Sequence, residues 1–168
     1  MKSKFLAAVF SLFLTSVAHS GGWQHTQKVD GFTDEVTTLV HPSENMLREA
    51  LVMGYDFMIP IIACSDNGVA FAINHRYLGG EEFDLVRVDL RVDKQPPYSG
   101  SWDLLSGQKV SASDSEGAQR IISSMLDGRE VLIRITGPDN IQKITATFNL
   151  AGFKNAYSNL PCQAQFSE

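Results

Sequence analysis

The sequence predicts a mainly β protein, built as an antiparallel β-sandwich or an open barrel with helices at its edges. Short segments rich in Val, Ile, Thr and aromatic residues recur between turns of Gly, Pro, Asn and Asp, which is typical of strands. One mid-chain segment has clear helical spacing, and a second, short helix is expected near the C-terminus. An α+β two-layer packing is the alternative, because unknown strand pairings separate the two architectures.

The first twenty residues have the composition of a cleavable export signal. Two lysines precede the apolar run 5–14, and the small residues Ala18 and Ser20 suit cleavage at Ser20-Gly21. The run is shorter than the roughly 20 residues that a membrane-spanning helix needs. We therefore expect residues 21–168 to form a single exported globular domain, periplasmic or secreted, without a membrane span.

The charge of the expected mature chain limits its partners. Cleavage leaves 12 basic and 19 acidic residues, a net charge of −7. Nucleic acids and anionic lipids both favour clustered Lys and Arg, so this balance disfavours them as partners. The remaining 148 residues are enough for one hydrophobic core.

The chain has two cysteines, Cys64 and Cys162. An exported protein with an even cysteine count usually pairs its cysteines, so a disulfide is expected here. On the chain-entropy model, closing so long a loop stabilises the fold by up to about 4.7 kcal/mol. A catalytic thiol or a metal site is the alternative, although neither cysteine belongs to a CxxC motif or a Cys/His cluster.

The first third of the chain reads as two strand pairs. Segments 23–29 and 35–40 flank the turn signal Asp30-Gly31, and segment 42–48 forms a short helical turn or a loop. Segments 55–63 and 69–75 flank Asn67-Gly68, a dipeptide typical of tight hairpins.

Pro60 interrupts the first strand of this second pair. Proline cannot donate a hydrogen bond to a neighbouring strand, so we expect an edge or a bulge at this position.

Segment 83–92 has the clearest alternation of the chain. The apolar residues predict a buried face: Val86, Val88, Leu90 and Val92. The charged residues between them predict a solvent-exposed face, here called the wet face: Arg87, Asp89, Arg91 and Asp93. After Pro96-Pro97, segment 100–105 predicts a short strand that carries Trp102. Trp23 and Trp102 are expected to pack in the core or at an edge.

The last third of the chain combines a helix with a hairpin. Segment 114–126 repeats its apolar residues at helical spacing and ends before Gly128. Segments 131–136 and 141–150 predict a hairpin, and 152–159 a final helix that leads to Cys162.

An ordered set of landmarks runs through the second half of the chain: Val86-Arg87-Val88-Asp89, Ser101-Trp102, Met125-Leu126-Asp127-Gly128, Val131-Leu132-Ile133-Arg134-Ile135, and Thr145 to Phe153 leading to Leu160-Pro161-Cys162. In this order they resemble the C-terminal domain of the VasI family of type VI secretion accessory proteins. Similar endings occur in the invasion-associated locus B family. The resemblance covers about a hundred residues and lacks the family's upstream cysteine-containing segment. It implies an exported, cofactor-free domain with paired cysteines, and it brings no catalytic residues.

The sequence contains no recognisable catalytic or metal-binding arrangement. His41 and His75 are the plausible general bases, yet no GxSxG or other nucleophile motif accompanies them, so each is interpreted as a surface or strand-end histidine. No HExxH motif or EF-hand loop appears. Gly79-Gly80-Glu81-Glu82 reads as a solvated loop, with a contact surface as the alternative.

The most informative polar set is the wet face of Arg87, Asp89 and Arg91, with Arg134 near it. Cross-strand ion pairs commonly do no more than stabilise a sheet surface, and the functional alternative is recognition of a carboxylate or of an acidic patch. We expect a non-catalytic exported protein that binds another envelope or secreted protein, possessing neither cofactor nor metal. An inhibitor or immunity protein against a cell-wall-degrading enzyme is the alternative function, and an unrecognised hydrolase ranks below both.

Overall fold

The computed structural model describes residues 22–29, 31, 34–50, 58–65, 68–81, 83–105, 110–113 and 115–162. The expected signal peptide lies outside these residues, as do Asp30, Asn67 and Glu82. The strands are β1 (Trp23–Val29), β2 (Val36–Pro42), β3 (Met58–Ser65), β4 (Gly68–His75), β5 (Leu85–Val92), β6 (Tyr98–Leu105), β7 (Val110–Ala112), β8 (Glu130–Thr136) and β9 (Lys143–Asn149). The helices are α1 (Glu44–Ala50), α2 (Ser115–Leu126) and α3 (Phe153–Ser158). The mainly β architecture with helices at its edges is confirmed.

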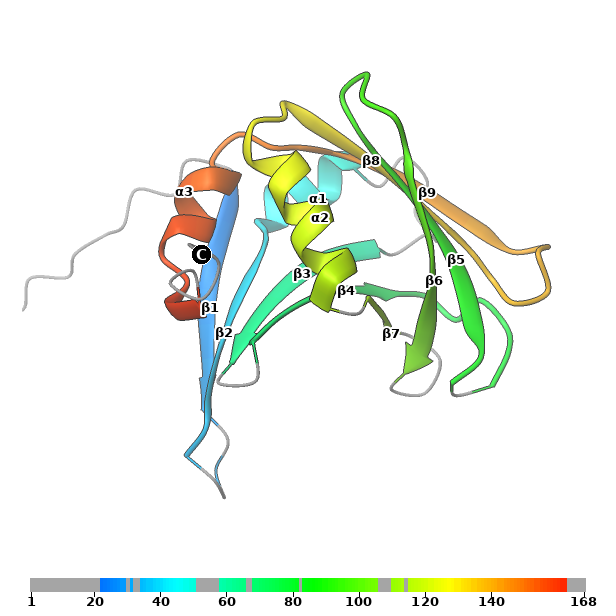
Figure 1. Cartoon of the computed structure of the whole chain (residues 1–168), viewed down its shortest axis with the longest axis horizontal. Coiled ribbons are helices and arrows are strands. Elements are labelled where there is room, and N and C mark those ends of the chain that lie inside the picture. The colour runs from blue at the N-terminus through cyan, green and yellow to red at the C-terminus, as the bar shows by residue number, and fades with distance from the viewer. Residues whose placement is uncertain are drawn as a thin grey trace, which may run out of the picture.

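The strands form one curled antiparallel sheet in the order β1-β2-β3-β4-β7-β6-β5-β8-β9. The half with β3 and β4 faces the half with β8 and β9 across the core, and both halves belong to the same hydrogen-bonded sheet (Figure 1). The sheet therefore has the form of an open barrel. The predicted hairpins β3–β4 and β8–β9 are both present.

Helix α2 covers the interior of the curled sheet on one side (Figure 1). It contacts β4, β5 and α3, and its apolar stripe is buried: Ala118, Ile121, Ile122 and Met125. The inward residues of β5 that the alternation predicts are all buried as well. The apolar stripe of α2 and the inward side chains of the sheet thus form one continuous core, while the opposite side of α2 is exposed.

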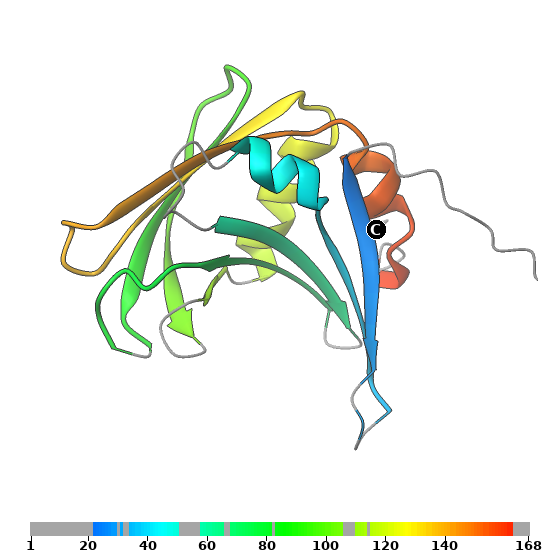
Figure 2. The same cartoon turned by 180° about the vertical axis from the view of Figure 1, so that it is seen from behind.

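The two edge strands approach each other at one end of the barrel. The Trp23 indole Nε1 in β1 donates a hydrogen bond of 2.9 Å to the carbonyl oxygen of Asn149 in β9. The same indole packs edge-to-face on Phe153 of α3, with ring centroids 4.9 Å apart. Trp23 and Trp102 are both buried, as expected. Seen from behind, α1 lies between β3 and β9 (Figure 2).

The disulfide Cys64–Cys162 links β3 to the segment after α3, and it joins residues 98 positions apart in sequence whose Cα atoms are 5.8 Å apart. Both cysteines are buried. The predicted disulfide is therefore present, and it holds the segment after α3 against the sheet.

Three elements differ from or refine the sequence prediction. Strand β7 was not predicted, because it has only three residues. Segment 42–48 was expected to be a helical turn or a loop, and most of it belongs to helix α1. Strand β3 lies inside the sheet, but its ladder with β2 spans only Ile62 to Cys64. Pro60 lies beyond that ladder, where the missing donor has no cost, and its pairing with Ile73 continues without a bulge.

Candidate functional site

The outer surface of β5, β8 and β9 carries most of the residues that the sequence singles out. Three rows of residues cross these strands: Arg87, Thr136 and Lys143; Asp89, Arg134 and Thr145; Arg91, Leu132 and Thr147. We call the exposed side chains of Arg87, Arg91, Leu132, Arg134 and Lys143, together with Asp89, the basic face. It has four cations and one carboxylate, on a chain of net charge −5.

Asp89 is the anchor of the basic face. Its Oδ1 accepts hydrogen bonds from Arg87 Nε at 3.0 Å and from Ser99 Oγ at 2.7 Å, and its Oδ2 lies 3.3 Å from Arg134 Nε. The carboxylate is 14% exposed, whereas Arg87 and Arg134 are 63% and 53% exposed. Partial burial raises the pKa of Asp89, but the bonds from Ser99 and Arg87 and the charges of Arg87 and Arg134 outweigh it and lower that pKa overall. The aspartate thus holds two guanidinium groups while leaving most of each in solvent.

Three of the four predicted site residues, Arg87, Asp89 and Arg134, form one network of ion pairs, and Arg91 lies on the same face outside that network. Arg91 Nε donates a 3.0 Å hydrogen bond to the carbonyl oxygen of Asp93, the residue that follows β5. Arg91 does not join the network around Asp89, because its Nε donates to the Asp93 carbonyl oxygen instead.

Sequence reasoning missed Leu132, Ser99 and Lys143 as part of this surface. The alternation of 130–136 already predicts that Leu132 and Arg134 share a face. Leu132 lies beside Arg91 because β5 pairs with β8, although β6, β7 and α2 separate these strands in sequence. No local sequence pattern predicts this pairing. Leu132 is 40% exposed, so the basic face has an apolar centre.

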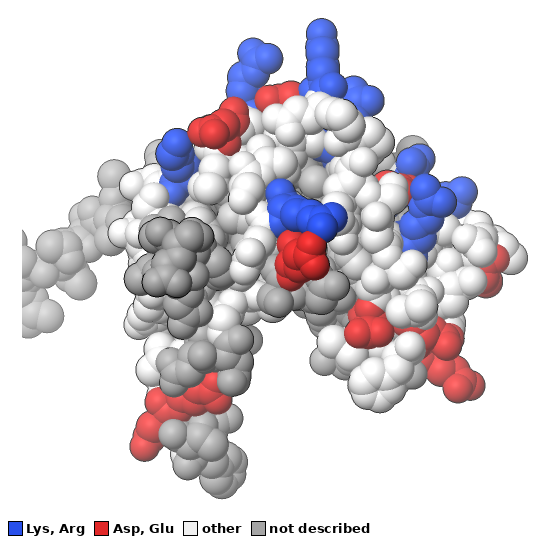
Figure 3. All heavy atoms as spheres, viewed as in Figure 1, with Lys and Arg blue, Asp and Glu red and all other residues white. Residues whose placement is uncertain are grey.

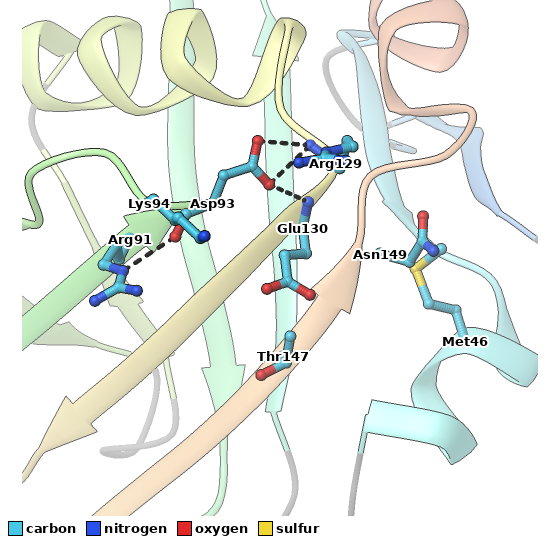
Figure 4. A pocket seen from close by; sticks show the side chains of 8 residues that line it. All are labelled: Met46, Arg91, Asp93, Lys94, Arg129, Glu130, Thr147 and Asn149. Atoms are coloured by element: carbon cyan, nitrogen blue, oxygen red, sulfur yellow. Dashed lines mark hydrogen bonds between the residues drawn. The ribbon is translucent and has the colours of Figure 1, made fainter.

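A hollow of about 600 Å³ lies at one end of the basic face, where the end of β5 meets the start of β8 (Figure 4). Arg91, Lys94 and Arg129 supply its cations, and Glu130 and Asp93 its carboxylates. Thr147 and Asn149 of β9 and Met46 of α1 complete the lining.

The two histidines considered as general bases lie in separate places. His75 is the last residue of β4 and is fully buried, so its interpretation as a surface histidine was wrong and its strand-end position was right. Burial lowers its pKa from 6.5, and the charge of Arg76 acts in the same direction, against the 2.7 Å hydrogen bond from Nδ1 to the Arg76 carbonyl oxygen. His41 lies on β2, where Nδ1 is 3.0 Å from the carbonyl oxygen of Pro42.

Two packed loops form a second surface at the other end of β5. We call residues 76–81, 83–84 and 137–142 the loop cluster. Arg76 donates a 3.0 Å hydrogen bond to Gln142, and a Cβ on Gly80, which has φ +83°, would lie 2.6 Å from Pro138 Cγ. The glycine loop predicted to be solvated is therefore packed against the β8–β9 turn.

The loop cluster exposes large apolar side chains among carboxylates. Phe83 is 70% and Ile141 is 81% exposed. Phe83 has φ 70°, a left-handed conformation that is an outlier for a bulky residue. Glu81, Asp84 and Asp139 lie in the same loops. In the space-filling view, carboxylates gather at the lower right, below the lysines and arginines of the top and right (Figure 3).

Within the described ranges, no three His, Cys, Asp or Glu side chains lie close enough to share a metal ion. No helix in this part of the chain is long and apolar enough to cross a membrane. Comparisons with family models, curated proteins and solved structures give no match. The geometry of the surfaces therefore carries the functional argument.

Proposed function

We propose that this chain is an exported, non-catalytic protein that binds another envelope or secreted protein through the basic face. The observation that carries the proposal is Leu132, an exposed apolar residue with Arg91 opposite it and Arg134 two positions away. Protein interfaces commonly place apolar residues at the centre and are enriched in arginine. The partner surface has an apolar pocket for Leu132 and carboxylates around it.

The charge of the face supports this choice of partner. On an acidic chain, a sheet surface with four cations and one carboxylate orients the approach of an acidic partner. Asp89 reduces the entropy cost of binding, because Arg87 and Arg134 are already held by it. The guanidinium forks remain accessible to carboxylates.

Export is part of the same proposal. The signal-like N-terminus and the buried disulfide both fit an oxidising compartment. The resemblance to the VasI family adds a link to a bacterial secretion system. A non-catalytic role is supported by His75, which the core encloses, and by His41, whose ring contacts Thr26 and the Pro42 carbonyl oxygen.

The test is site-specific photo-crosslinking in the exporting cell. A photo-reactive residue in place of Thr145 lies on the outer surface, beside Arg134, and one in place of the exposed Gln119 lies on α2. We expect one protein to crosslink at position 145 and not at position 119. Loss of that product in the Arg87→Glu/Arg134→Glu variant supports the proposal, whereas a product of equal yield at both positions contradicts it.

A second candidate function rests on the loop cluster. Phe83 has a strained backbone and its ring is mostly in water, and such strain concentrates at functional sites. An apolar tip among carboxylates is suited to the cleft of a basic enzyme, as a periplasmic inhibitor of a muramidase would require.

The inhibitor function is tested by muramidase assays with the purified protein. We expect the protein to inhibit a basic muramidase, and Phe83→Gly and Ile141→Ser to abolish inhibition. Arg87→Glu, at the other surface, leaves this inhibition unchanged. Full activity of a panel of muramidases in the presence of excess protein removes this candidate.

A further inference from the structure

The hollow beside Arg91 is framed by a strained turn at Asp93. Asp93 has φ 49°, and its carboxylate accepts hydrogen bonds from the backbone N–H of Arg129 at 3.2 Å and of Glu130 at 3.1 Å (Figure 4). Its own N–H donates a 3.1 Å hydrogen bond to the Glu130 carbonyl oxygen. These bonds join the end of β5 to the start of β8. The hollow is therefore a preformed feature of the fold.

Among the described residues, these bonds leave three cations without a carboxylate partner. The Asp93 carboxylate is occupied by backbone donors, and the side chains of Lys94 and Arg129 form no ion pair with any described residue. Arg91 uses Nε on the Asp93 carbonyl oxygen, which leaves its terminal nitrogens to a ligand. Three cations and two carboxylates give the hollow a net positive charge on an acidic chain.

The β9 side of the hollow adds oriented hydrogen-bonding groups. Asn149 Oδ1 accepts a 2.7 Å hydrogen bond from the Ala151 N–H, which fixes the amide and leaves its NH₂ group as a donor. Thr147 contributes a hydroxyl, and Met46 an apolar wall. Figure 4 shows Glu130 directed towards Thr147 and away from Asp93.

We propose that this hollow binds a carboxylate group of a peptide or protein between Arg91, Lys94 and Arg129. A guanidinium fork matches the two oxygens of a carboxylate. Three cations and two carboxylates leave the hollow one net positive charge, which a singly charged carboxylate neutralises. Glu130 is in turn an acceptor for the N–H groups of a peptide backbone. The volume of about 600 Å³ accommodates a short chain segment.

The site deepens the proposed function, since Arg91 belongs to both the basic face and the hollow. The identity of the protein that supplies the carboxylate rests on the proposed function. Binding of a small carboxylate by the isolated protein does not depend on that protein, so the titration below can fail while the crosslinking succeeds, and the reverse.

The test is an NMR titration of the ¹⁵N-labelled exported protein with three small probes. N-acetylglutamate α-amide, which has a free side-chain carboxylate, represents an acidic side chain. N-acetyl-triglycine represents a free C-terminus, and N-acetyl-triglycine amide is the neutral control. We expect saturable shifts of the Arg91 Nε–H and of the Lys94 and Arg129 amides with at least one acidic probe. The acidic probe that saturates identifies which source of carboxylate the hollow takes.

Variants complete the test. Arg91→Gln/Arg129→Gln raises the Kd of the acidic probe at least tenfold, and Arg120→Gln on α2 leaves it unchanged. Three results overturn the proposal: equal shifts with the neutral amide, an unchanged Kd in the double variant, or tighter binding of inorganic phosphate than of both acidic probes.

Discussion

His75 makes stability depend on pH near neutrality. Because burial lowers its pKa in the folded protein, the unfolded chain takes up a proton near pH 6.5 while the folded chain does not. We expect the free energy of unfolding to be constant above about pH 7 and to fall as the pH drops below 6.5 towards the native pKa. Chemical denaturation of wild type and His75→Gln measures this. We expect the free energy of unfolding of His75→Gln to lose this dependence on pH, whereas the control His41→Gln keeps it. If the dependence persists in His75→Gln, another group causes it.

Asp89 acts in a lower pH window. Its lowered native pKa means that its contribution is present above about pH 3.8 and is lost as the pH falls through the native pKa. Asp89→Ala should cost about 1 to 2 kcal/mol at pH 7, because two arginines and a serine lose their acceptor. Urea denaturation at pH 7 and pH 2.5 measures the difference, which should shrink at the lower pH. Asp103→Asn, on the exposed side of β6, is the control and changes little.

Phe83 combines a backbone cost with little burial. Phe83→Gly removes the cost of its left-handed conformation, so we expect stability to rise by up to about 1 kcal/mol. Phe83→Ala removes the ring and keeps the positive φ, and it should not stabilise the protein. Thermal unfolding of the two variants separates backbone from side chain. Destabilisation by Phe83→Gly would mean that the ring has a structural role in the loop cluster.

At the scale of elements, the disulfide holds α3 in place. Replacing both cysteines by serine should lower stability by about 2 to 5 kcal/mol, because Cys64–Cys162 closes a long loop in the unfolded chain. Hydrogen exchange should then accelerate in Phe153–Ser158, while Leu85–Val92 and Glu130–Thr136 in the opposite half of the sheet stay protected. An equal loss of protection throughout the sheet contradicts this local role.

Strands and helices whose apolar residues recur at regular spacing could be predicted from the sequence, and very short elements could not. The alternation of Leu85–Val92 and the apolar stripe of Ser115–Leu126 both correspond to observed elements within two residues. Val110–Ala112 is too short to show a period, yet it connects β4 to β6 and so joins the two halves of the sheet. The choice between sandwich and barrel depended on this one strand.

At the scale of the whole molecule, the sequence identified residues of the candidate site but not how the strands place them side by side. Arg87, Asp89 and Arg91 share a face by parity alone. The position of Arg134 opposite Asp89, and of Leu132 opposite Arg91, follows from the pairing of β5 with β8 across a connection that contains β6, β7 and α2. The hollow likewise requires β5, β8, β9 and α1 to converge, and pairwise patterns do not encode that convergence.

The opposite ends of the curled sheet have different characters. The hollow at one end of β5 is cationic (Figure 4), and the loop cluster at the other end is apolar and acidic. The two surfaces are far enough apart along β5 that substitutions at each should act independently on binding.

The affinity for the protein captured at position 145 shows whether the basic face is the binding surface. We expect the Kd to rise at least a hundredfold for Arg87→Glu/Arg134→Glu and at least tenfold for Leu132→Asp, while Arg120→Glu on α2 binds like wild type. The Kd should also increase with salt concentration for wild type. A Kd that is the same in wild type and in both basic-face variants would contradict the account.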